Sequence, residues 1–66
     1  MRTHLSIVTE HVEKLGLGDK SGITHADQLS LVKSLTDANE YVLAEYFRGL
    51  KHPSELEDFI VNQIYG

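Results

Sequence analysis

The chain has 66 residues, no cysteine, 41% hydrophobic residues and a formal net charge of -4. This composition excludes disulfides and cysteine-based zinc sites, and the acidic balance argues against non-specific binding to nucleic acid or an anionic membrane surface. No apolar run approaches the ~20 residues that a membrane-spanning helix needs, and no signal peptide is recognisable. We expect a single cytoplasmic domain over residues 1–66, which is marginal in stability for its size.

The first predicted helix spans residues 3–15, because apolar residues recur there at steps of three and four. They are Leu5, Val8, Val12 and Leu15. Gly16 suits the left-handed conformation just past a helix end, and Leu17 would then fold back on the last turn. Ile7 lies off this apolar face, so it is either a lone exposed residue or part of a second contact surface.

The glycine-rich stretch LGLGDKSG follows, and it matches neither a phosphate loop nor a calcium loop. Asp19 precedes Lys20 where a phosphate loop has glycine, and no strand leads into the stretch. A calcium loop that starts at Asp19 would need glycine at Thr24 and glutamate at Ser30. We therefore expect neither a phosphate site nor a calcium site in this stretch.

The middle segment, residues 25–50, is predicted to form one long helix. Thr24 is its expected N-cap, with Asp27 at the third helical position. At about 100° per residue, the apolar residues before and after residues 36–39 point in nearly the same direction. They are Leu29, Val32, Leu35, Val42, Leu43, Tyr46 and Leu50. A turn would usually lose this phase, so continuity is favoured; a break near residues 36–39, giving four helices instead of three, is the alternative.

Asn39 lies at the centre of the apolar stripe if that helix is continuous. It would then occupy a wet spot or kink, mark a helix boundary, or pair with Asn39 of a second copy and set the register of a dimer. A helix roughly 37 Å long cannot be covered fully by two shorter helices unless they lie end to end. This mismatch and the small size of the chain lead us to expect a helical homodimer.

The last predicted helix spans residues 54–65. Ser54 is its expected N-cap, with Glu57 three residues later, and Pro53 stops the preceding helix from running on. Its apolar face comprises Leu56, Phe59, Ile60 and Ile64. The sequence therefore predicts an all-α domain of three helices, or four if the middle segment breaks.

The sequence contains no recognisable catalytic or cofactor-binding pattern, and we expect neither enzyme activity, nor a cofactor, nor a metal site. The histidines are His4, His11, His25 and His52, and no two of them have the i, i+4 spacing of a helical zinc site. Acyl carrier proteins carry phosphopantetheine on the serine of an Asp-Ser-Leu motif. Here Asp27 is followed by Gln28 and Leu29, so this group has no serine to attach to. Surface histidines exposed to solvent are the default interpretation.

The composition and the predicted helices favour a small protein-binding module, such as a regulator, inhibitor or adaptor, that binds an unidentified protein partner without catalysis. The candidate contact residues are aromatic, apolar or charged positions off the predicted core, namely Tyr41, Glu45, Arg48, Ile7 and Tyr65. One alternative is a DNA-associated transcriptional regulator with a helix-turn-helix-like pair at residues 37–49 and 53–64. Nucleic acid binding is disfavoured because Glu55, Glu57 and Asp58 would face phosphates. A purely structural assembly subunit is the other alternative.

Overall fold

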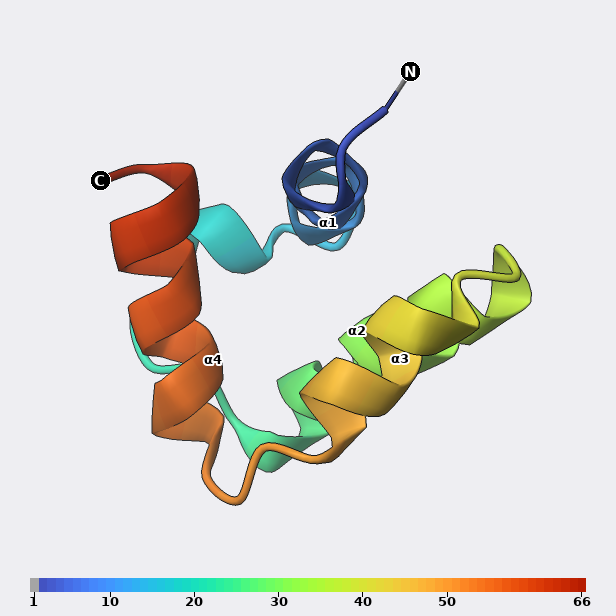
Figure 1. Ribbon diagram of the computed structural model, residues 1–66. Coiled ribbons are helices and arrows are strands. Elements are labelled where there is room, and N and C mark those ends of the chain that lie inside the picture. The colour runs from blue at the N-terminus through green and yellow to red at the C-terminus, as the bar shows by residue number, and fades with distance from the viewer. Residues whose placement is uncertain (1) are drawn as a thin grey trace.

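The computed structural model describes residues 2–66, and every regular element in that range is helical. In chain order the elements are α1 (His4–Lys14), the 3₁₀ turn η1 (Leu17–Asp19), α2 (His25–Asp37), α3 (Tyr41–Arg48), α4 (Pro53–Phe59) and the π-helical segment η2 (Ile60–Ile64), which continues α4. Figure 1 shows α4 and η2 on one side and the pair α2–α3 on the other, with α1 between them at one end. The all-helical prediction is confirmed.

The start and end of α1 follow the local signals in the sequence. The Thr3 side chain caps the helix by accepting a hydrogen bond from the Ser6 amide at 3.0 Å. Gly16 adopts a left-handed φ of 71°, and its amide donates to Glu13 O at 3.1 Å. Leu17 then enters the core, as predicted from the cap.

The N-terminus of α2 is also confirmed. The Thr24 hydroxyl accepts from the Asp27 amide at 3.2 Å, while the Asp27 carboxylate accepts from the Thr24 amide at 2.9 Å. These two bonds form a reciprocal capping box. Lys20 pairs with the same carboxylate at 2.8 Å, and this bond is the largest cause of the lowered pKa of Asp27, followed by the Thr24 amide.

The prediction of one long middle helix is wrong. The segment breaks at Asn39 and gives four α-helices, which was the alternative prediction. Asn39 has a left-handed φ of 63°. The Glu40 amide donates to Leu35 O at 2.8 Å, and the Asn39 amide donates to Thr36 O at 3.0 Å. These two bonds are the Schellman pattern, in which a left-handed residue just past the helix satisfies the last carbonyls.

The chain reverses at this turn, so that α3 packs antiparallel against α2 (Figure 1). The apolar spacing is misleading here. A short turn can leave the apolar residues of the next helix at positions that would also share one face of a continuous helix. The stripe inferred from this spacing mixed core and surface positions: Leu35 and Leu43 are buried, whereas Leu29, Val42 and Tyr46 are exposed. It also left out three core residues, namely Leu31, Ala44 and Phe47.

The break also changes the expectation of a dimer. Asn39 is exposed in a turn, where its Oδ1 accepts a hydrogen bond from the Tyr41 hydroxyl at 2.9 Å. It therefore does not lie on a helix face, and the register role assigned to it loses its structural basis. Without a long helix to cover, the geometric argument for a homodimer no longer holds, and the homodimer itself stays a prediction.

The capping residues of α4 differ from those predicted. The helix begins at Pro53, with His52 as the N-cap, and not after Ser54. Proline suits the first helical position, since its amide has no hydrogen to leave unpaired and its φ is fixed near the helical value. Glu55 consequently takes the role predicted for Glu57, and its carboxylate accepts from the amides of residues 51 and 52 at 2.9 and 3.1 Å.

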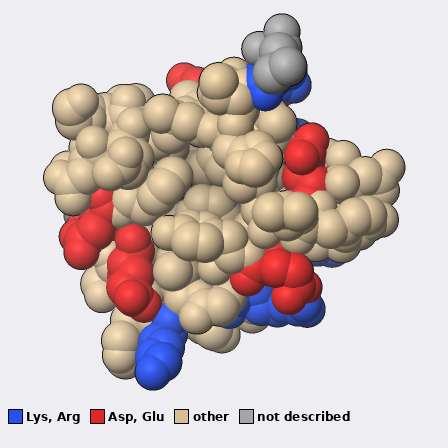
Figure 2. Space-filling model, in the orientation of Figure 1, with Lys and Arg blue, Asp and Glu red and all other residues tan. Residues whose placement is uncertain are grey.

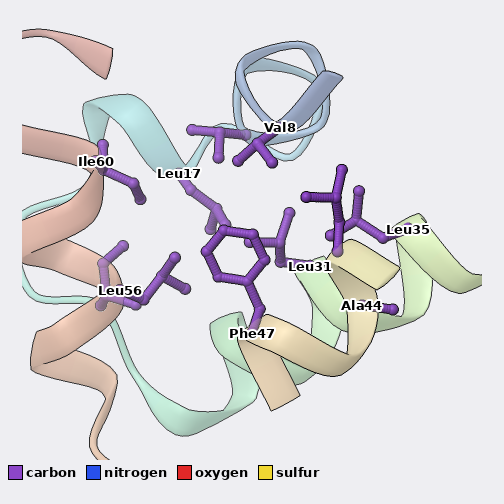
Figure 3. Packing of buried hydrophobic residues seen from close by; sticks show 11 residues of the cluster. Val8, Leu17, Leu31, Leu35, Ala44, Phe47, Leu56 and Ile60 are labelled. Atoms are coloured by element: carbon purple, nitrogen blue, oxygen red, sulfur yellow. The ribbon is translucent and has the colours of Figure 1, made fainter. Parts of the chain in front are cut away.

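The core lies where the four helices meet. Phe47 points into its centre, surrounded by Val8, Leu17, Leu31 and Leu56 (Figure 3). Apolar residues from every α-helix contribute to this cluster, which comprises Val8, Val12, Leu17, Ile23, Leu31, Leu35, Leu43, Ala44, Phe47, Leu56 and Ile60. A single core joins all the elements, although the chain has only 66 residues.

One polar side chain lies inside this core, and the sequence analysis missed its role. Gln28 is only 2% exposed, and its Nε2 donates to Phe47 O at 2.7 Å and to Leu50 O at 3.0 Å. The first turn of α2 is thereby bonded to the carbonyl of Phe47, near the end of α3, and to that of Leu50, two residues past this end. Carbonyls at a helix end lack some of their helical donors, and a side chain can replace them. Gln28 Oε1 is buried without a hydrogen-bond partner among residues 2–66.

We predict that Gln28→Leu lowers the free energy of unfolding by about 1–3 kcal/mol, because the carbonyls of Phe47 and Leu50 lose the side-chain donor while the volume of the side chain is roughly kept. Gln28→Glu should cost more at neutral pH, since a carboxylate cannot donate to them. Urea denaturation measures both variants. Ser30→Ala, on the exposed side of α2, is the control and should stay within ~0.5 kcal/mol of the parent. A Gln28→Leu variant as stable as the parent would contradict this role.

At Asn39 the order of two substitutions separates the turn from a continuous helix. In the left-handed conformation Asn39→Ala should cost about 1 kcal/mol, whereas Asn39→Gly should be nearly neutral. In a continuous helix the order would be reversed, because alanine exceeds glycine by about 1 kcal/mol in a helix interior. Thermal unfolding of the two variants decides between them, and a more stable Asn39→Ala would contradict the turn.

His11 makes the stability of the fold depend on pH. Its Nδ1 lies 2.7 Å from Ser34 Oγ. Burial lowers the pKa of His11, and repulsion from Lys14 and, more weakly, from Arg2 lowers it further. Attraction by Glu40 opposes these effects. This partly buried position corrects the default of a solvent-exposed histidine. A lowered folded-state pKa means that the unfolded chain binds the proton more readily.

We therefore predict full stability from this group above its usual pKa of 6.5 and a loss as the pH falls below that value. Urea titrations at pH 8 and pH 5.5 should show a smaller difference for His11→Asn than for the parent. His25→Asn, at an exposed position, is the control. An unchanged pH difference in His11→Asn would show that another group is responsible.

Candidate interaction groove

An open apolar groove lies between α1, α3 and the α4–η2 helix, with a volume of about 340 Å³. Each of the three helical elements supplies part of the lining. The lining residues are His4, Leu5 and Val8 from α1, Val42, Leu43, Tyr46 and Phe47 from α3, and Phe59 and Gln63 from α4 and η2. We call this feature the apolar groove.

The floor of the apolar groove belongs to the core, so it is rigidly held. Val8, Leu43 and Phe47 are all buried. The Phe47 ring meets the Phe59 ring edge to face, with centroids 5.2 Å apart and planes at 84°. Tyr46 meets Phe47 in the same manner at 5.0 Å and 85°. Edge-to-face contact is a preferred arrangement of aromatic pairs and favours these ring orientations.

The rim of the apolar groove carries bulky apolar side chains that remain in contact with water. Leu5 is 43% exposed, Val42 is 73% exposed and Tyr46 is 56% exposed. Scattered exposed apolar residues are ordinary, but these three border one concavity. Grouped apolar exposure around a hollow is typical of a binding surface.

The groove continues at one end into an acidic hollow of about 320 Å³. The two share Tyr46, Phe59 and Gln63, and the second adds Leu50, Asn62, Glu55 and Asp58 to the lining. Figure 2 shows one face of the molecule, on which uncharged atoms fill the centre and charged side chains of both signs stand toward the edges. The joined lining of the two hollows is thus apolar in the groove and negative at one end.

Sequence analysis missed the rim because Leu5, Val42 and Tyr46 were assigned to the core. A signal for Val42 and Tyr46 exists in α3 itself. All of its eight residues except Glu45 and Arg48 are apolar or aromatic, which is more apolar surface than one buried face can cover. A helix of this kind contacts neighbours on a second side.

Three of the predicted contact residues share one face of α3, next to the rim. Tyr41, Glu45 and Arg48 are exposed, and Arg48 forms an ion pair with Glu45. The Tyr41 hydroxyl is occupied by its bond to Asn39. This face borders the apolar groove but does not line it.

The other two predicted contact residues lie elsewhere. Ile7 is half-buried and packs against the core, so neither sequence-based interpretation describes it fully. Tyr65 is exposed but covers η1, where its ring leaves no room for a side chain at Gly18. The structure therefore does not bring the five residues into one site.

Two further hollows lie on the surface of residues 2–66. One of about 400 Å³ lies between the η1 region and the α4–η2 helix, and its lining mixes charged side chains such as Lys20 and Glu57 with apolar ones and Tyr65. A larger hollow of about 800 Å³ is lined by α1 and the two residues before it alone, so it is the open outer surface of one helix and not a cleft. Among residues 2–66 no group of three or more His, Asp or Glu side chains could hold a metal ion. None of the helices described over this range is long and apolar enough to cross a membrane.

Comparison with known proteins supplies no relative: no family, no curated protein and no solved structure matches the chain. The chemistry of the groove is then the starting point for its function. Polar groups enter its lining from His4, Gln63 and the hydroxyl of Tyr46, and the other lining side chains are hydrocarbon. A site of this composition gains free energy by burying apolar groups of a ligand.

Proposed function

We propose that this chain is a protein-binding module that takes a helical segment of a partner protein into the apolar groove. The observation that carries the proposal is the exposure of Leu5, Val42 and Tyr46 around one concave, apolar floor. Helix-in-groove recognition buries apolar side chains spaced by one turn in a hollow of this kind. Binding would give the chain a regulatory, inhibitory or adaptor role without catalysis.

The openness of the rim favours a protein segment over a small molecule. Sites for small molecules enclose most of the ligand surface. Here Val42 projects into solvent with 73% of its surface exposed, and Tyr46 stands beside it on the next turn of α3. Side chains that stand out from a rim can cover the flanks of a helix lying along the groove.

The charge of the chain disfavours the DNA-binding alternative. A helix-turn-helix arrangement would place the first turns of α4 against phosphates. Glu55, Glu57 and Asp58 occupy these turns. Their charges would repel DNA, whereas they pose no obstacle to a protein partner.

Site-specific photo-crosslinking in the native host tests the proposal. We predict that a benzoylphenylalanine at Val42 gives one dominant protein adduct, because this position overhangs the groove. The same crosslinker at Leu29, an exposed apolar position on α2 outside the groove, is the matched control and should give none.

A second variant tests whether the Val42 adduct forms in the groove. Leu5→Glu, on the opposite wall, should remove the Val42 adduct while circular dichroism shows an intact fold. Equal adducts from Val42 and Leu29, or no adduct from Val42, would contradict the proposal.

A further inference from the structure

We infer that the segment bound in the apolar groove is a short amphipathic helix with Lys or Arg just beyond its apolar residues, and that these cations meet Glu55 and Asp58. This inference rests on the proposed function and names the chemistry of its partner. The observation behind it is the continuity of the apolar groove with the acidic hollow through Tyr46, Phe59 and Gln63. A ligand that fills the first would reach the second.

The two carboxylates of the acidic hollow, Glu55 and Asp58, are not paired with a Lys or Arg side chain within residues 2–66; Lys51 lies beside Glu55 but reaches it through its backbone amide, at 2.9 Å. Neither Lys nor Arg lines the acidic hollow, and Asp58 forms no ion pair within residues 2–66. Arg48, on α3, is engaged by Glu45. The Glu55 carboxylate receives only backbone amides, which leave its charge in place. Complementary charge on a partner would be favourable here, and like charge would be repelled.

The dimensions of the groove set the length of the segment. The lining runs from Val42, on α3, to Leu50, two residues past the end of α3, which is about 12 Å at the helical rise of 1.5 Å per residue. The apolar rim occupies the first turn of this span, between Val42 and Tyr46, and the acidic side chains stand near its far end. A fitting helix therefore has apolar residues at i, i+1 and i+4 and basic residues at i+7 and i+8.

A second copy of this chain is a poorer occupant than a basic segment. Each copy carries a formal charge of -4, so that two copies repel one another. Arg48, an exposed cation on α3, is already paired with Glu45 and is therefore less available to the acidic hollow of a second copy. Charge complementarity thus favours a different, basic partner.

Three hydrocarbon-stapled helical peptides test the inference. They share leucines at i, i+1 and i+4 and carry Lys, Gln or Glu at i+7 and i+8; the staple lies on the opposite face. Titration into the full chain, followed by fluorescence anisotropy at 50 mM salt, gives the three dissociation constants. We expect the Lys peptide to bind about tenfold more tightly than the Glu peptide, with the Gln peptide between them.

Two variants locate the charge that discriminates. Asp58→Asn should reduce the difference between the Lys and Glu peptides several-fold, as should 0.5 M salt. Asp19→Asn removes the same charge from an exposed position outside both hollows and should leave the difference unchanged. Asp58 is preferred to Glu55 for this test because the Glu55 carboxylate also caps α4.

Other outcomes overturn the inference. Equal affinities for the three peptides, tighter binding of the Glu peptide, or no binding of any peptide would each do so. A dimer in sedimentation at the assay concentration that Val42→Glu dissolves would show that a second copy fills the groove. A Val42 crosslink to a partner protein in the host would still support the proposed function, so the two failures are distinguishable.

Discussion

The hydrogen bonds of the buried Gln28 amide hold the start of α2 against the end of α3, and the rest of the structure depends on this link. Its Nε2 reaches the carbonyls of Phe47 and Leu50, 19 and 22 residues away. Asn39 closes the other end of the hairpin, where its left-handed backbone lets the chain reverse. With both ends fixed, Phe47 points into the core and α4 can pack around its ring.

The same hairpin produces the apolar groove. A short helix that is apolar on most sides can bury only one of its faces against α2. The face bearing Leu43 and Phe47 closes the core, and the adjoining face bearing Val42 and Tyr46 is left beside α1 and α4. The surface that we assign to binding is therefore a consequence of the fold, because α4 diverges from α3 instead of covering it.

Local signals predicted much of this structure, and long-range ones were hidden. Gly16 and the Thr24–Asp27 capping box act over three or four residues, so the sequence shows them directly. Periodicity could not reveal the reversal at Asn39, since a tight turn leaves the apparent phase intact. Nor does the sequence show that Gln28 faces carbonyls far along the chain. The rim residues were recognised as apolar but assigned to the core for the same reason.

The most direct test of the binding surface is an NMR titration of the isotopically labelled chain with the partner recovered by crosslinking. If the partner binds in the groove, the largest backbone amide shifts will cluster around Leu5, Val42 and Tyr46, and Leu29 will be unaffected. Shifts confined to the outer face of α3, at Tyr41, Glu45 and Arg48, or to the exposed side of α2, would contradict the groove as the site of binding.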